Sequence, residues 1–245
     1  MKSRHIPETI KRRLRQEACF GCAICGNPII QYAHIIPFSI SQRHDPCHMI
    51  LLCPTDHVRA DRDEYFRKTL YKYKAHPYNA NQGFVKGSFR IEGEKLIINA
   101  GTNRFVNTPN ILVVDQRRLV SLRKMNDLLF LDADFFNERN QILVSIKENE
   151  WHTNIESAWD IQYRPIHLKI YSAARNILLE LKVVSGEVWF RADMFYNGFP
   201  ISIKGDHMRV GENDFFLSDN SVENQEGGIA VDTKKSSISI GGAIN

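Results

Sequence analysis

The stretch that decides the fold of this chain is Cys22-Ala-Ile-Cys25, followed by Tyr32-Ala-His-Ile-Ile-Pro37 and by His48-Met-Ile-Leu-Leu-Cys-Pro-Thr-Asp-His57. It sets cysteines at the spacing of metal ligands and places histidines between them. Cysteine thiolates can hold a structural zinc ion, while histidines outside such a clamp can activate water or bind a second metal. This region therefore predicts a small, metal-stabilised domain.

Four side chains of this stretch have the spacing of a tetrahedral zinc site. Cys22 and Cys25 form a C-x-x-C pair, and Cys53 begins a second such pattern, whose fourth position is Asp56. Three thiolates and one carboxylate can coordinate zinc, and Cys47 is a substitute candidate. Two alternatives stay open: buried reduced cysteines, or a redox pair, which would need a βαβ context that this sequence lacks. We expect structural zinc.

Length and composition are typical of a globular protein with one large domain or two small ones. The chain has 245 residues, 43% of them apolar. No run reaches the ~20 apolar residues of a membrane span. The five cysteines, an odd number confined to the first quarter of the chain, predict a reducing compartment rather than a disulfide framework. Because no apolar leader stands near the N-terminus, we expect a soluble cytoplasmic protein with no membrane contact.

Positive charge gathers in the first third of the chain. Residues 1–88 carry 14 Lys and Arg against 7 Asp and Glu, a net charge of +7, whereas residues 89–245 carry 18 against 21. Residues 7–18 have the spacing of an amphipathic helix, whose basic side includes Arg12, Arg13 and Arg15. Such a side suits a phosphate backbone, so these arginines are candidate nucleic-acid contacts. A solvated basic helix explains the same pattern and stays open as an alternative.

Further elements are expected before residue 86. Residues 32–38 and 49–52 are apolar and β-prone, and Thr55 can cap a helix that begins at Asp56. A second helix is predicted over 63–75, with its buried face formed by Phe66, Leu70 and Tyr73.

Beyond residue 86 the pattern changes to short segments in which apolar and polar residues alternate between turns. Such segments at close spacing predict an all-β domain. We therefore predict an α+β protein with a metal-stabilised domain at 1–85 and an all-β domain at 86–245. The β domain is expected to be a solenoid-like stack or a sandwich, with a barrel as a further alternative.

Residues 6–79 resemble the HNH endonucleases, whose ββα-metal fold consists of two strands and a helix around one catalytic metal. The resemblance rests on Cys22-x-x-Cys25-Gly26, on His34-Ile-Ile-Pro37 and on Ile50-Leu-Leu-Cys-Pro-x-x-His57. The whole chain also looks like a group of bacterial HNH-domain proteins with a β-rich C-terminal region. This likeness implies a metal-dependent endonuclease that hydrolyses phosphodiester bonds, with DNA as the expected substrate and a role in bacterial defence as a hypothesis.

The same resemblance implies roles for three histidines. His34 stands at the position of the general base, His48 where the family commonly has an asparagine, and His57 at the position of a metal ligand. The catalytic ion would be Mg²⁺, Mn²⁺ or Ni²⁺ and would bind the scissile phosphate. Its candidate ligands are His57, His48 and Asp45.

The chain departs from the family pattern at Ala33, where members often have an acidic residue or a second histidine that binds the metal. Asp45 is the candidate for the missing carboxylate, and Arg59 and Arg62 are candidate phosphate contacts. Two alternatives follow. One is a zinc-stapled nucleic-acid-binding protein that does not cut. The other is a protein that functions through its β domain, which would bind a protein partner or self-associate while the first domain is accessory.

Overall fold

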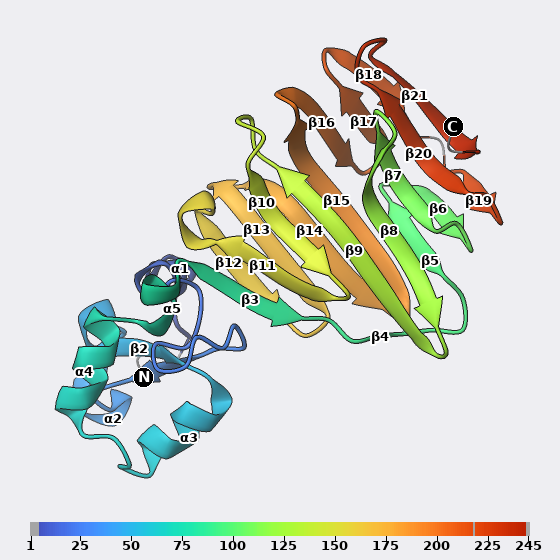
Figure 1. Cartoon of the computed structure of the whole chain (residues 1–245). Coiled ribbons are helices and arrows are strands. Elements are labelled where there is room, and N and C mark those ends of the chain that lie inside the picture. The colour runs from blue at the N-terminus through green and yellow to red at the C-terminus, as the bar shows by residue number, and fades with distance from the viewer. Residues whose placement is uncertain (1–4, 218, 244–245) are drawn as a thin grey trace. The chain divides into compact units, whose positions relative to one another are not determined.

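The computed structural model describes residues 5–217 and 219–243 and divides the chain into two compact units (Figure 1). Unit 1 comprises residues 1–87 and 154–164, and unit 2 comprises residues 88–153 and 165–245. The protein is α+β and mostly β. The first boundary lies close to the predicted one. The prediction of two consecutive domains misses residues 154–164, which belong to unit 1.

A two-stranded antiparallel sheet forms the centre of unit 1. It pairs β1 (Gln31–His34) with β2 (Met49–Leu52), so that His34 lies opposite Met49. All four residues of β2 are buried, because helices cover both faces of the strand. The predicted strand at 32–38 is therefore too long: β1 ends at His34, and a short helix, α2 (Phe38–Ser41), follows.

Helices surround this sheet. The first, α1 (Glu8–Glu17), begins after Pro7 and buries Leu14 against β2, in good agreement with the predicted helix. The others are η1 (Pro46–His48), α3 (Pro54–Asp61), α4 (Arg67–Ala75) and α5 (Tyr78–Gln82). None of the helices in the described ranges has the length and apolar character needed to cross a membrane.

The second predicted helix is wrong at its start. It was expected to begin near residue 63 with Phe66 on its buried face. Instead α4 begins at Arg67, and Phe66 occupies its N-cap with 82% of its surface exposed. Leu70 is buried, as the helical spacing predicts. The predicted helix is too long only at its N-terminal end, because it includes residues 63–66, which precede α4.

Unit 1 is completed by segments from outside its first 82 residues. These are β3 (Phe84–Ser88), η2 (Ile155–Ser157) and β12 (Asp160–Arg164). The backbone N–H of Ile155 donates to the carbonyl of Gly83 at 3.2 Å, and Gln16 Nε2 donates to the carbonyl of Trp159 at 2.7 Å. Residues 154–164 are therefore tied to the N-terminal part of the chain.

Unit 2 is built of strands joined by short turns. They are β4 (Ile91–Glu92), β5 (Ile97–Ala100), β6 (Asn103–Val106), β7 (Asn110–Val114), β8 (Arg117–Met125), β9 (Leu128–Phe136), β10 (Ile142–Lys147), β11 (Glu150–Asn154), β13 (His167–Ala173), β14 (Asn176–Val184), β15 (Glu187–Tyr196), β16 (Phe199–Lys204), β17 (His207–Val210), β18 (Asn213–Phe216), β19 (Ser221–Glu223), β20 (Gly227–Asp232) and β21 (Ser237–Gly242). The alternating segments thus form strands, as predicted.

Strand pairing in unit 2 combines hairpins with three parallel ladders. Strands β5, β6 and β7 pair in parallel with β15, β19 and β20. Strand β15 also meets β9, where Phe195 lies opposite Phe136. The expected solenoid-like stack or sandwich therefore stays a prediction for unit 2. Alternation within each strand is the same in all three architectures, so it could not identify the distant partners.

Candidate metal centre and histidine site

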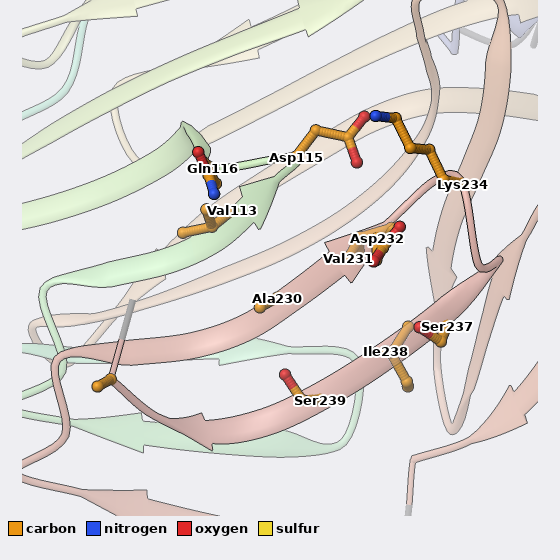
Figure 2. A pocket seen from close by; sticks show the side chains of 11 residues that line it. Val113, Asp115, Gln116, Ala230, Val231, Asp232, Lys234, Ser237, Ile238 and Ser239 are labelled. Carbon is orange, nitrogen blue, oxygen red and sulfur yellow. The ribbon is translucent and has the colours of Figure 1, made fainter. Parts of the chain in front are cut away.

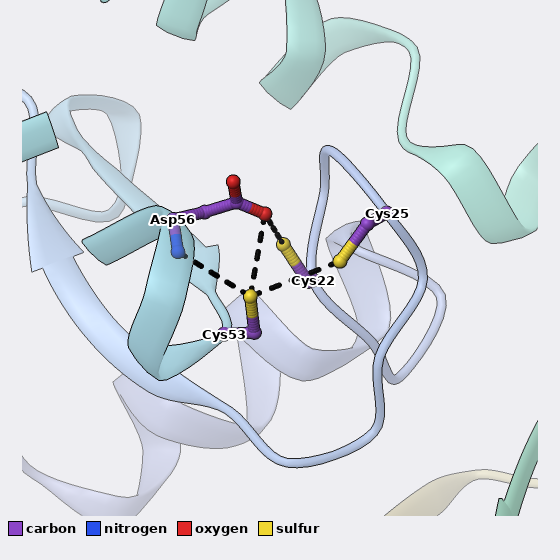
Figure 3. A group of neighbouring side chains, drawn as sticks. All are labelled: Cys22, Cys25, Cys53 and Asp56. Atoms are coloured by element: carbon purple, nitrogen blue, oxygen red, sulfur yellow. Dashed lines mark hydrogen bonds between the residues drawn. The ribbon is translucent and has the colours of Figure 1, made fainter. Parts of the chain in front are cut away.

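Four side chains of unit 1 converge as the spacing predicted. The ligand atoms of Cys22, Cys25, Cys53 and Asp56 all lie within 4.8 Å of one another (Figure 3). Cys25 Sγ is 3.8 Å from Cys53 Sγ, and Asp56 Oδ2 is 3.2 Å from Cys22 Sγ. A tetrahedral zinc ion, with Zn–S bonds of about 2.3 Å and Zn–O bonds of about 2.0–2.2 Å, gives ligand separations of about 3.5–3.8 Å. The cluster could therefore hold a metal ion, and its geometry is compatible with structural zinc.

A tight turn brings the first two cysteines together. The backbone N–H of Gly26 donates to the carbonyl of Cys22 at 2.8 Å, and Gly26 has a φ of +77°. A Cβ at this position would lie 2.4 Å from Asn79 Oδ1. Asn79 in turn donates to the carbonyl of Cys19 at 3.0 Å. Only glycine fits this close approach in a left-handed conformation.

The other two ligands anchor the start of α3. Cys53 occupies the N-cap, and its sulfur accepts a hydrogen bond from the backbone N–H of Asp56 at 3.4 Å. The prediction that Thr55 caps this helix is therefore wrong. Pro54, at the first helical position, has no N–H to satisfy. A metal held here would fix the helix that carries His57.

Electrostatics in the cluster favour a bound cation. Burial raises the pKa of the Cys22 and Cys53 thiols. Burial alone would also raise the pKa of Asp56, but hydrogen bonds from Tyr65 and the thiols lower it below its ordinary value. The Tyr65 hydroxyl donates to Asp56 Oδ1 at 2.8 Å. The Asp56 carboxylate is favoured in its ionised form, whereas the buried thiols would lose their protons on binding a metal. A bound cation would stabilise both the carboxylate and the thiolates.

His34 stands at the end of β1 beside a histidine that the sequence interpretation missed. Its Nε2 is 3.1 Å from Nδ1 of His44, and the Phe38 ring stacks on His44 at 4.8 Å. The chain returns to His34 because α2 ends at Gln42 in a left-handed conformation, with a φ of +48°. His34 and His44 are ten residues apart, an interval that does not indicate a metal site or a catalytic pair in the sequence. The two rings meet only because the chain reverses its direction at Gln42.

The surroundings of His34 keep its imidazole neutral. Burial lowers the pKa of His34 below its ordinary value of 6.5, and the neighbouring His44 and His57 lower the pKa further. His57, in α3, has its Nδ1 3.1 Å from Asp61 Oδ2. A neutral imidazole is the form that can take a proton from water. The three histidines therefore share one electrostatic neighbourhood.

The other two candidate ligands of a catalytic metal have partners of their own. His48 Nδ1 is 2.7 Å from the Tyr71 hydroxyl, and Asp45 Oδ1 accepts the backbone N–H of Cys47 at 2.9 Å. Over residues 5–217 and 219–243, the cluster of three cysteines and Asp56 is the only group of three or more potential ligands that comes within 4.8 Å. His48, His57 and Asp45 form no such group, so their metal role stays a prediction. Cys47 is exposed and lies outside the cluster.

Arg15 is not available to a phosphate, which corrects its prediction as a nucleic-acid contact. Its side chain is 4% exposed and donates to both carboxylate oxygens of Asp160, at 2.7 and 2.6 Å. It also contacts Tyr32 and Glu8. The helical pattern showed that residue 15 is charged, but it could not show that an acidic partner from β12 would bury it.

The remaining predicted arginines lie nearer the surface. Arg12 stacks over the Trp159 ring at 4.4 Å, and Arg13 pairs with Glu17 at 2.7 Å. Arg62 is exposed at the end of α3.

Arg59 lies beside the metal cluster. It pairs with Glu64 at 2.9 Å and lies 3.7 Å from Asp56 Oδ1. Its guanidinium is therefore positioned to support the charge of the Asp56 carboxylate.

Comparison of the chain with models of protein families, with curated proteins and with solved structures found no match. The function of the site therefore rests on its residues and their geometry.

Proposed function

We propose that unit 1 is an HNH-type endonuclease that uses a divalent metal to hydrolyse phosphodiester bonds in DNA. The observation that carries the proposal is the succession of two antiparallel strands and a helix in β1, β2 and α3. His34 ends the first strand, His57 lies in the helix, and the cysteine cluster anchors that helix at its start. The succession of two strands and a helix is the one that the ββα-metal fold of HNH enzymes would have, and it carries the motif residues His34 and His57.

His34 serves as the general base in this proposal. Its lowered pKa keeps the imidazole neutral at pH 7, and it takes a proton from the water that attacks phosphorus. His44 lies within hydrogen-bonding distance and orients the ring. A divalent ion such as Mg²⁺, Mn²⁺ or Ni²⁺ would neutralise charge on the scissile phosphate and the leaving oxygen. His57, with His48 and Asp45, would hold that ion.

The charge of the N-terminal region supports a polyanionic substrate. Residues 1–88 have a net charge of +7. Arg13, Arg59 and Arg62 are exposed on unit 1, and Arg12 is half-buried. Lys and Arg near a phosphate backbone give affinity that falls steeply with salt. None of the five cysteines forms a disulfide bond, so we place the activity in a reducing compartment such as the cytoplasm.

A cleavage assay tests the proposal. Zinc-loaded protein is incubated with plasmid DNA and, separately, Mg²⁺, Mn²⁺ or Ni²⁺. We expect cleavage with at least one ion and a loss of about 10²–10⁴-fold in His34→Ala, the range for removal of a general base. His76→Ala, which removes an exposed imidazole at the end of α4, is the matched control and should cleave normally. Folded wild-type protein that cleaves with none of these ions would contradict the proposal.

The positions of His48 and Asp45 favour a second candidate, a nucleic-acid-binding protein that does not cut. Both side chains are engaged by Tyr71 and Cys47 rather than grouped around an ion position, and Ala33 offers no ligand. This candidate predicts DNA binding that weakens with salt and no cleavage with any divalent ion. The same assay, combined with a binding titration, separates the two candidates.

A further inference from the structure

A hollow of about 400 Å³ opens in unit 2 over strands β14 and β15. Its walls include Gly101, Glu180, Lys182, Val184, Trp189 and Arg191. The antiparallel register sets Lys182 opposite Trp189 and Glu180 opposite Arg191. An aromatic ring and two cations therefore stand side by side on one face of the sheet. A hollow of this size lies in the range of small-ligand sites.

The indole of Trp189 is unusually accessible. Trp151, the other tryptophan of unit 2, is fully buried, whereas Trp189 is 44% exposed. Its neighbours Val188 and Phe190 are buried, because successive side chains of a strand point to opposite faces. Among the described residues, no aromatic ring or cationic group stacks on Trp189. A large apolar ring face is thus left open in a polar setting.

Positive charge beside this ring is incompletely neutralised. Glu180 accepts from His167 at 2.9 Å and from Lys169 at 3.0 Å, so its carboxylate is already occupied. Arg191 Nη1 lies 4.0 Å from Glu180, and Arg191 Nε is buried without a hydrogen-bond partner in the described part of the chain.

Lys182 completes the cationic side of the hollow. It forms no ion pair with any residue of the described ranges. An unsatisfied guanidinium nitrogen and an unpaired ammonium at one hollow favour an anionic ligand.

We infer that this hollow binds single-stranded nucleic acid, with a base stacked on Trp189 and adjacent phosphates held by Lys182 and Arg191. Base stacking on aromatic side chains combined with a cationic groove is the general mode of single-strand recognition. The volume suits one nucleotide, and the open mouth leaves room for the strand to continue. The inference rests on unit 2 alone and is independent of the proposed nuclease function of unit 1.

A second hollow in unit 2 provides a contrast. It has a volume of about 480 Å³ and lies by the β20–β21 hairpin, where it is lined by aliphatic, serine and acidic side chains and by Gln116 and Lys234 (Figure 2). Figure 2 shows the Lys234 ammonium turned toward the carboxylate of Asp115. No aromatic side chain lines this hollow. Lys234→Gln therefore removes one cation from a hollow that lacks a stacking surface.

The test is a titration of the full chain against a fluorescently labelled twelve-nucleotide oligo-dT, followed by anisotropy without added divalent metal. Trp189→Ala should weaken binding by about 5- to 150-fold, the range for loss of one stacked base. Trp189→Phe should retain more affinity than Trp189→Ala. Lys182→Gln should weaken binding and reduce its salt dependence. Lys234→Gln should bind like the wild type.

Three results would overturn the inference. They are no binding by the wild-type protein, equal affinity of Trp189→Ala and wild type, and displacement of the oligonucleotide by free dTMP at equal nucleotide concentration. The last result would assign the hollow to a mononucleotide instead of a strand. Plasmid cleavage is measured separately on the same variants. A protein that binds the oligonucleotide but never cuts contradicts only the nuclease proposal, and one that cuts but shows no effect of Trp189 contradicts only this inference.

Discussion

The guanidinium of Arg15 donates two hydrogen bonds to the carboxylate of Asp160, 145 positions later in the chain. The two side chains are 4% and 2% exposed. Burial alone would lower the pKa of Arg15, but the hydrogen bond and the charge of Asp160 raise it above its ordinary value. The Arg15 guanidinium is therefore held in its charged form within unit 1, and its hydrogen bonds to Asp160 join α1 to β12.

Loss of one partner of this pair should destabilise unit 1 strongly. Asp160→Asn leaves the charge of Arg15 buried, with only the exposed Glu8 as an acidic neighbour. Removal of one partner of a buried ion pair lowers the free energy of unfolding by about 3–5 kcal/mol. Urea unfolding of the full chain measures the change in free energy. Glu17→Gln, which removes a more exposed partner of Arg13 and Lys74, is the control and should have a smaller effect. Equal effects of the two variants would contradict the structural role of the pair.

Zinc should bind at about one equivalent per chain through the four clustered ligands. Cys22→Ser removes a buried ligand and should abolish this stoichiometry, as measured by elemental analysis of the purified protein. Cys47→Ser, at an exposed cysteine outside the cluster, should retain the metal. Zinc retained in Cys22→Ser, or absent from the wild type, would favour the interpretation of the cysteines as reduced core residues.

The hydroxyl of Tyr65 should tune metal affinity through Asp56. Tyr65→Phe removes the 2.8 Å hydrogen bond to Asp56 Oδ1 and should weaken zinc binding by about 10–100-fold, as for other partners that orient metal ligands. Competition with a chromophoric chelator measures the affinity. Tyr73→Phe is the matched control, because it removes a hydroxyl from the neighbouring ring and leaves the hydrogen bond from Tyr65 to Asp56 in place. The centroids of the Tyr65 and Tyr73 rings are 6.5 Å apart. Similar affinities of the two variants would show that the hydrogen bond does not matter.

Cleavage should depend on pH through His34. Because burial and the neighbouring histidines lower the pKa of His34, its neutral form persists below pH 6.5, and the rate should fall only as the pH drops through this lowered value. His44→Gln removes one of these neighbours, so the acidic limb of the rate profile should move upward, toward 6.5. A wild-type limb at or above 6.5 would exclude His34 as the base that controls the rate.

Local patterns in the sequence predicted the local elements of unit 1 well. The amphipathic spacing over residues 7–18 identified α1, and the apolar run at 49–52 identified β2. The cysteine spacing identified the cluster, since Cys22, Cys25 and Cys53 need only a short turn and a sheet to meet. The predicted start of α4 was wrong, because a helix boundary depends on tertiary contacts as well as on local spacing. Phe66 is apolar, yet it lies exposed at the N-cap of α4.

Contacts between distant segments could not be predicted in the same way. No spacing signals that Asp160 will bury Arg15, because neither residue carries information about a partner so far along the chain. His44 was missed because it approaches His34 only through the reversal at Gln42. The parallel ladders of unit 2 could not be predicted from the sequence either. A strand has the same alternation of apolar and polar residues whichever strand it pairs with.

The return of residues 154–164 to unit 1 sets an order of events during synthesis on the ribosome. Arg15 emerges early, but Asp160 follows only after the strands from β4 to β11 have been made. Unit 1 therefore cannot close as a finished N-terminal domain while the chain is still short, as a consecutive domain would. Completion of unit 1 would therefore wait for most of the polypeptide, and a prematurely released fragment would lack the carboxylate that pairs with its buried arginine.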